Sequence, residues 1–214
     1  MSVLEDTTLS NDFNQIMRDM MENFSFYSGI VVTFSVLMLS ISISNPMKGG
    51  FYVAWVLFST VVRLIFLIMT NNITYNGNEK CKKGGLPGKL SNYDGGRNSI
   101  YILCFTLLYI WFPMFITNNV NWYLVWLIIT CIAFDSMIKY TSQCVTSGLS
   151  IIGEMFGGAT AGLFISGFMY YLGLSRFLFI NSLNGNKEVC SIPKKQTYKC
   201  AVYKNGEIIS SMNA

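Results

Sequence analysis

The chain has 214 residues, of which 52% are hydrophobic and only 12% are charged, about half the charged fraction of an average soluble domain. This composition indicates a membrane protein rather than a soluble globular domain. The net charge of +4 is spread over short loops, which argues against nucleic acid as a partner. The sequence contains no histidine, which excludes hydrolases that need a histidine nucleophile or general base.

The first 24 residues contain five acidic side chains and one arginine, whereas a cleavable signal peptide begins with basic residues. Residues 9–24 predict an amphipathic helix, because apolar side chains recur there at helical spacing. We expect this helix, within an N-terminal segment 1–24, to lie on the bilayer or against the bundle. Anionic lipid would repel its acidic face, so a contact with another protein is the alternative.

Apolar runs follow at residues 25–44, 51–70, 99–117, 122–138 and 145–180. The first four are each about the 20 residues that cross a ~30 Å hydrocarbon layer. For the fifth we expect one tilted helix that ends near Gly173, in preference to two short spans with a turn near Gly167. The sequence therefore predicts an all-α polytopic transmembrane helix bundle of about five spans over residues 25–180.

Five spans put the N-terminus, loop 71–98 and the connection 139–147 on one side of the membrane, and the tail on the other. Lysine and arginine are evenly divided between the two sides, so the positive-inside rule does not choose an orientation. A disulfide could join Cys81 to Cys144 on the first side or Cys190 to Cys200 on the second. Only one side can face an oxidising compartment.

The two polar segments differ in their predicted structure. Loop 71–98 is rich in glycine, asparagine and proline, which indicates irregular backbone. In the polar tail, residues 181–214, two alternating runs flank Asn205-Gly206, the strongest short signal for a β-hairpin. Because the tail cysteines lack the further ligands of a zinc site, we expect neither a metal nor a cofactor.

Charged and small side chains interrupt the apolar runs. Asp135 and Lys139 are spaced i,i+4 in the order that stabilises a helix, and Arg63 and Glu154 are candidates for a second pair across the bundle. Two glycine pairs have the spacing that lets helices pack closely in lipid; these helix-packing candidates are Gly153, Gly157, Gly158 and Gly162.

Ser150, Glu154, Gly158 and Gly162 recur every four residues at the start of the last span. This spacing resembles the third motif of the type 2 phosphatidic acid phosphatase superfamily, in which an arginine, a histidine and an acidic residue precede spaced glycines. Cys144 stands in place of that arginine and Ser150 in place of the histidine.

The loop before the third span also resembles the family's second motif, Pro-Ser-Gly-His. It retains Pro87 and Gly88, followed by Lys89, with Leu90 in place of the histidine. Without these histidines the resemblance implies an inactive enzyme that keeps an anion pocket for a lipid phosphate. The candidate ligand-binding residues are Arg63, Lys80, Lys82, Lys83, Lys89, Arg97 and Glu154. The alternative for the basic loop is solvation at a headgroup surface.

The abundance of asparagine, isoleucine, lysine, serine and methionine resembles small membrane proteins of large DNA viruses, which line the lipid layer beneath a capsid. We therefore expect a non-enzymatic structural or scaffolding membrane protein, located in the internal membrane of a virion. Its partners would be the bilayer and other membrane or capsid proteins, contacted through the N-terminal helix and the tail. The alternatives are a lipid-phosphate-binding pseudo-enzyme and, with less support, a small-solute channel or transporter, since the sequence has no clear repeat or ring of charges.

Overall fold

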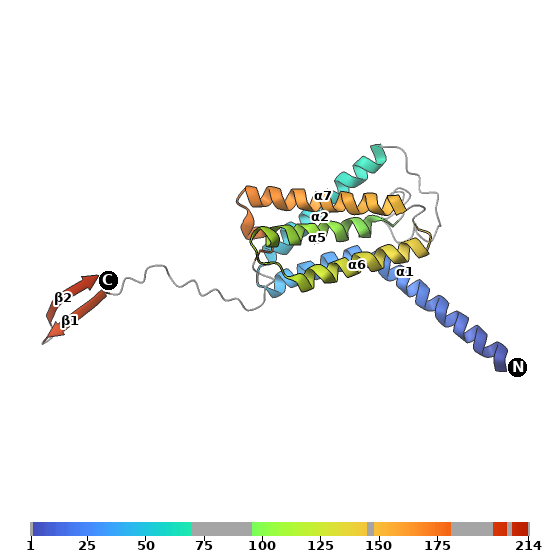
Figure 1. Cartoon of the computed structure of the whole chain (residues 1–214), viewed down its shortest axis with the longest axis horizontal. Helices are drawn as coiled ribbons and strands as arrows, with labels where there is room; N and C mark the ends of the chain where they lie inside the picture. The colour runs from blue at the N-terminus through green and yellow to red at the C-terminus, as the bar shows by residue number, and fades with distance from the viewer. Residues whose placement is uncertain (1, 70–95, 145–147, 181–198, 205–206, 214) are drawn as a thin grey trace. The chain divides into compact units, whose positions relative to one another are not determined.

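The computed structural model of the chain describes residues 2–69, 96–144, 148–180, 199–204 and 207–213; the side chains of residues 2–14, 18 and 199–213 are not described. Five long helices run side by side in the first three of these ranges (Figure 1). They are α1 (Ser2–Ser42), α2 (Pro46–Met69), α5 (Asn98–Ile116), α6 (Trp122–Thr141) and α7 (Gly148–Tyr171). A short 3-10 helix, η2 (Ser175–Phe177), follows α7.

All five helices are long and apolar enough to cross a membrane, with the α1 span covering Gln15–Ser42. The predicted helical bundle, with five helices able to span a membrane, is thereby confirmed, and it is compatible with the expected multi-pass membrane location. The fifth run contains one helix and not two: α7 ends at Tyr171, and Gly173 follows with φ of +73°. That left-handed conformation is readily accessible to glycine, which explains why the helix stops there.

The first helix differs from its prediction. We expected an amphipathic helix over 9–24 and a separate span from residue 25, but α1 is one continuous helix of 41 residues. No proline occurs in it, and Gly29, its single glycine, lies inside the span. Nothing in the local sequence therefore forces the chain to turn between the acidic N-terminal part and the apolar part.

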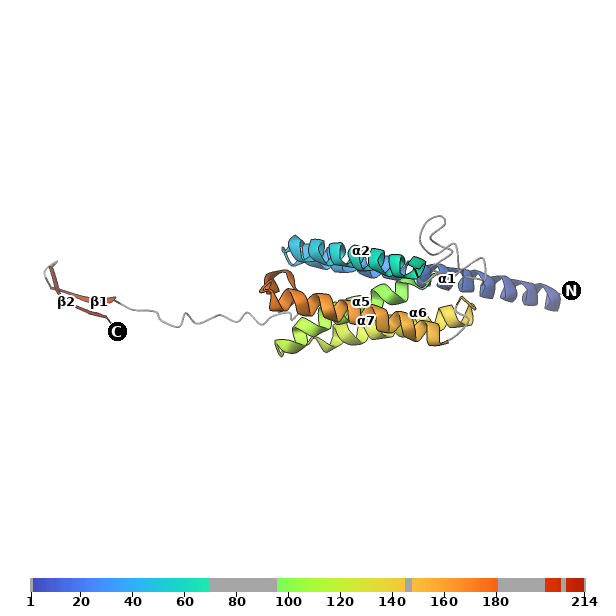
Figure 2. The same ribbon diagram turned by 90° about the horizontal axis from the view of Figure 1, so that it is seen from above.

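Side-chain hydrogen bonds stabilise the short connections between helices. Between α1 and α2, the Ser40 hydroxyl donates to the Asn45 carbonyl at 2.5 Å and accepts from the Gly49 amide at 2.8 Å. At the start of α6, the Asn121 side chain accepts from the Leu124 amide at 3.3 Å, as an N-cap does. These turns join antiparallel neighbours, as Figure 2 shows for α1 and α2.

Helix α5 lies in the middle of the bundle and contacts α1, α2, α6 and α7. Its side chains Ile100, Leu103, Phe105 and Tyr109 are fully buried. The other helices expose large apolar side chains such as Phe66, Trp126 and Phe164 on their outer faces. An apolar outer face over a packed interior is what a bundle surrounded by lipid requires.

Helix α7 packs on α5 through two of the predicted glycines. A Cβ atom on Gly158 would overlap the carbonyl oxygen of Tyr101, and one on Gly162 would overlap that of Phe105. A Cβ on Gly157 would make ordinary contact with the Tyr101 ring, at 3.7 Å. The prediction does not hold for Gly153, where a Cβ would have no described atom within 4 Å, because this residue is on the exposed face of α7.

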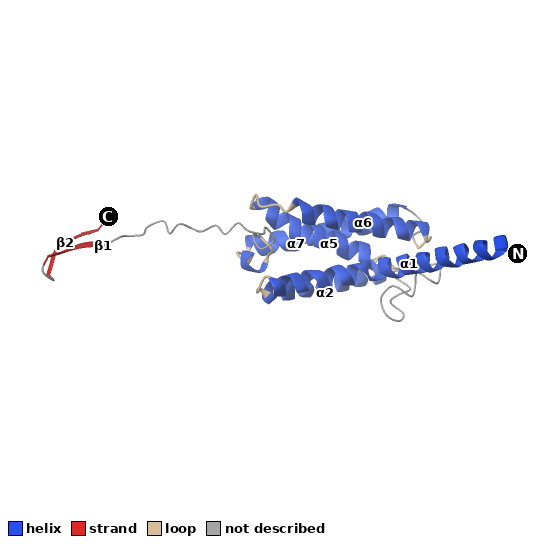
Figure 3. Cartoon of the chain, turned by 90° about the horizontal axis from the view of Figure 1, so that it is seen from below, coloured by secondary structure: helices blue, strands red, loops and turns tan. Residues whose placement is uncertain are grey.

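Residues 185–214 form a separate unit. In it, β1 (Lys199–Lys204) and β2 (Glu207–Asn213) pair antiparallel, with Lys199 opposite Asn213 and a register shift between Val202 and Tyr203. The two strands are coloured red in Figure 3. The turn residues Asn205 and Gly206 lie outside the described part of the chain.

Candidate functional site: two buried charge clusters

The intramembrane charges gather at one depth of the bundle. Arg63 lies six residues before the end of α2, Asp135 six before the end of α6, and Glu154 six after the start of α7. At a helical rise of 1.5 Å per residue this places all three about 9 Å inside the same end of the bundle. The charges therefore form a polar layer near the end of the bundle where α2 and α6 end and α5 and α7 begin.

The first cluster, which we call the arginine cluster, consists of Arg63, Arg97, Asn98, Ser150 and Glu154. Arg63 donates to both carboxylate oxygens of Glu154, from Nε at 2.7 Å and from Nη2 at 2.8 Å. The two side chains are only 7% and 11% exposed. Such bidentate pairing is the strongest form of an ion pair between these residue types, and it confirms the contact that we expected across the bundle.

Arg97, at the start of α5, completes this cluster. Its Nη1 donates to the Ser150 hydroxyl at 2.6 Å, and its Nε lies 3.8 Å from Glu154 Oε1. Arg63 also donates to the Asn98 side chain at 3.3 Å and lies over the Tyr101 ring at 5.3 Å. Two guanidinium groups thus share one carboxylate, and three helices supply the partners.

The second cluster, which we call the aspartate cluster, consists of Ser25, Ser99, Asp135 and Lys139. Lys139 Nζ donates to Asp135 Oδ2 at 2.9 Å and to the Ser99 hydroxyl. Ser99 donates to Asp135 Oδ2 at 2.8 Å, and Ser25 donates to Asp135 Oδ1. Asp135 is 1% exposed and Lys139 is fully buried. The expected i,i+4 pair is therefore present, and serines of α1 and α5 enclose it.

The structure brings together only part of the predicted anion site. Arg63, Arg97 and Glu154 meet in the arginine cluster, beside Ser150. Lys80, Lys82, Lys83 and Lys89 lie outside the described residues, as do Pro87, Gly88 and Leu90 of the second motif. Cys144 is bonded in a disulfide; Cys81, the partner that the sequence offers on this side, is also outside the described residues.

Sequence reasoning missed Ser25, Ser99, Asn98 and Tyr101, which supply or surround the hydrogen bonds of both clusters. The signal in the sequence was weak: Ser99 and Asn98 stand at the polar edge of a span, where such residues are common, and Ser25 begins an apolar run. Ser25 and Ser99 become hydrogen-bond donors to the buried Asp135 carboxylate only because α1 and α5 pack against α6.

The buried carboxylates of the polar layer find their hydrogen-bond donors within the bundle. Each carboxylate accepts hydrogen bonds on both of its oxygens, which is the condition under which buried charges are tolerated in the membrane. Within the described residues, no three histidine, cysteine, aspartate or glutamate side chains come together as metal ligands would.

Comparison with known proteins adds no relative: no protein-family model, curated protein or solved structure matches the chain.

Proposed function

We propose that this chain is a non-enzymatic structural component of a membrane, with the internal membrane of a large DNA virus as its setting. The observation that carries the proposal is the mutual pairing of the intramembrane charges. Glu154 is bound by both oxygens to Arg63, and Asp135 accepts from three donors. A general acid or base needs an oxygen that can reach a substrate proton, whereas these oxygens are bonded to side chains that, with the carboxylates themselves, come from all five long helices.

The proposal is tested by supplying the substrate that the phosphatase resemblance suggests. Protein purified in detergent should release no phosphate from short-chain phosphatidic acid above a protein-free control. Phosphate release that Ser150→Ala abolishes would overturn the proposal, since Ser150 occupies the position of the motif histidine. Ser150→Ala removes one hydroxyl and leaves the Arg63–Glu154 pair intact, so the fold is retained.

The viral setting has its own test. In purified particles of a large DNA virus that encodes this chain, quantitative mass spectrometry should find the chain at a fixed ratio to the major capsid protein. Removing the membrane with detergent should release it together with lipid. A protein absent from purified particles would contradict this part of the proposal and leave the non-enzymatic role to be judged by the phosphatase assay.

A lipid-phosphate-binding role is the second candidate, and the arginine cluster favours it. Two guanidinium groups, Arg63 and Arg97, converge on Glu154 within about 9 Å of one end of the bundle. Arginine is well suited to bind phosphate oxygens. Both arginines belong to the candidate ligand-binding residues predicted from the sequence, and Arg97 is one that the phosphatase resemblance assigns to the anion pocket.

This second role predicts selective retention of an anionic lipid. Nanodiscs made of phosphatidylcholine with a small fraction of phosphatidic acid are assembled with the protein, and the lipids that copurify in detergent are then measured. The parent chain should enrich phosphatidic acid, and Arg97→Gln should abolish the enrichment. Arg176→Gln, which removes an arginine at the opposite end of the bundle, is the matched control. Equal retention of both lipids by the parent would reject this role.

A further inference from the structure

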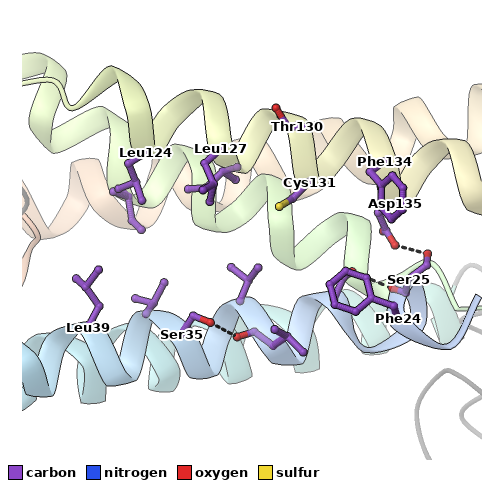
Figure 4. A pocket seen from close by; sticks show the side chains of 16 residues that line it. Phe24, Ser25, Ser35, Leu39, Leu124, Leu127, Thr130, Cys131, Phe134 and Asp135 are labelled. Atoms are coloured by element: carbon purple, nitrogen blue, oxygen red, sulfur yellow. Dashed lines mark hydrogen bonds between the residues drawn. The ribbon is translucent and has the colours of Figure 1, made fainter. Parts of the chain in front are cut away.

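An apolar groove opens between α1 and α6, over α5, and is independent of the arginine cluster. Its volume is about 610 Å³. Val31, Val36 and Leu39 of α1 line one wall, and Leu124, Leu127 and Phe134 of α6 line the other. Figure 4 shows Leu39 and Leu124 at one end of the groove, and Phe24, Phe134 and Asp135 at the other.

The groove offers almost nothing to a polar ligand. Its hydroxyl groups all donate their protons inside the protein: Ser25 to Asp135, Ser28 to the Ser25 carbonyl, Ser35 to the Val31 carbonyl and Thr130 to the Trp126 carbonyl. The Asp135 carboxylate accepts from Ser25, Ser99 and Lys139. The remaining lining side chains are aliphatic, aromatic or, at Cys131, a thiol. These lining side chains therefore favour a hydrocarbon chain over a polar ligand.

The dimensions match one acyl chain. From Leu124 to Asp135 the groove follows α6 for about 16 Å, since a helix rises 1.5 Å per residue. This is close to the half-thickness of a ~30 Å hydrocarbon layer. The groove is therefore long enough for an acyl chain that enters from one leaflet and stops near the middle of the bilayer.

The two ends of the groove differ, which sets a direction. Leu39 and Leu124 lie within three residues of the ends of α1 and α6 that meet the short connections. At the other end, beside the lining residues Phe24 and Phe134, the Ser25–Asp135 hydrogen bond joins α1 to α6, about 9 Å short of the opposite end of α6. A lipid can thus enter from the leaflet at the α1–α2 connection, with its headgroup outside and its chain end at Phe134.

We propose that the α1–α6 groove holds one acyl chain of a membrane phospholipid, inserted from the leaflet at the α1–α2 connection and ending against Phe134. The acyl chain contacts apolar side chains of α1 and α6 that do not cover one another. Because α1 and α6 meet through Ser25 and Asp135 at one end, the bound chain serves as the packing between them along the rest of their length.

The test uses photoactivatable lipid. The full chain is reconstituted in phosphatidylcholine nanodiscs that contain phosphatidylcholine with a diazirine at the end of one acyl chain, and labelled peptides are mapped by mass spectrometry. We expect labelling concentrated near Phe134 and Cys131, well above that of outward-facing Phe66 and Phe164. A second probe, with the diazirine next to the acyl carboxyl group, should instead label near Leu39 and Leu124.

Variants separate the groove from ordinary lipid contact. Ser35→Phe fills the groove from an exposed position and should remove most of the groove labelling. Ser42→Phe is the matched control, because Ser42 is also exposed on α1 and also donates to the carbonyl four residues earlier, but does not line the groove. Three results would each overturn the proposal. They are even labelling of all lipid-facing residues in the parent, labelling of the opposite ends of the groove by the two probes, and crosslinks between the α1 helices of two copies. If Ser35→Phe does not fold, the labelling pattern of the parent decides alone.

Discussion

At the scale of single residues, the intramembrane charges were predictable as pairs but not as clusters. The spacing of Asp135 and Lys139 on one helix gives their contact from local geometry. The contact of Arg63 with Glu154 follows from the cost of leaving either charge in lipid. The serines that complete the coordination of Asp135 come from α1 and α5, and no local rule assigns them to it.

The aspartate cluster predicts a strong asymmetry between single and double substitutions. Asp135→Asn leaves the Lys139 charge buried without its counterion, which should destabilise the fold by roughly 3–5 kcal/mol. Adding Lys139→Met removes that charge and should recover more than half of the loss. The measurement is the Tm of each variant in the same detergent, arranged as a double-mutant cycle. Equal Tm values for Asp135→Asn and for the Asp135→Asn, Lys139→Met double variant would contradict the assigned pairing.

At the scale of helices, the glycine spacing identified the packing face of α7 but not which glycine belongs to it. Gly158 and Gly162 approach the backbone of α5 at Tyr101 and Phe105. Gly153 has the same four-residue spacing to Gly157 and yet faces outward. The small-xxx-small pattern defines a stripe on the helix, whereas the position of α5 decides which part of the stripe is used.

This difference makes a matched pair of alanine variants informative. Gly158→Ala would place a Cβ within 3.1 Å of the Tyr101 Cα, so the two helices must separate, at a cost of roughly 1–3 kcal/mol. Gly153→Ala meets no described atom and should be neutral or stabilise the helix by up to about 1 kcal/mol. Thermal unfolding in detergent compares the two variants with the parent. A Gly158→Ala protein that melts with the parent would show that close packing on α5 is not needed.

At the scale of the whole molecule, the disulfide at Cys144 addresses the orientation that the balanced charges leave open. Cys144 follows α6, on the side shared with the N-terminus. Disulfides persist in oxidising compartments. We therefore expect the end of the bundle that carries Cys144 to face such a compartment and the α1–α2 connection to face the other.

Two accessible positions test this topology. Gly148→Cys lies at the first residue of α7 and Asn45→Cys in the α1–α2 connection, and both positions are exposed. Each is placed in a background that keeps Cys81 and Cys144 and replaces the other four cysteines by serine. An impermeant thiol reagent applied from the oxidising side should label Gly148→Cys alone. Labelling of Asn45→Cys from that side would reverse the orientation, and labelling of both would exclude five spans.

The sequence by itself determined the class, the number of spans and the end of the last one. Each of these follows from a local requirement: about 20 apolar residues to cross hydrocarbon and a glycine where a helix stops. Only the tertiary structure decided that α1 is continuous, that serines of two helices surround Asp135, and that α1 and α6 stand apart over a groove. These features depend on how whole helix faces fit together, because in lipid the association of helices is driven by packing and not by hydrophobicity.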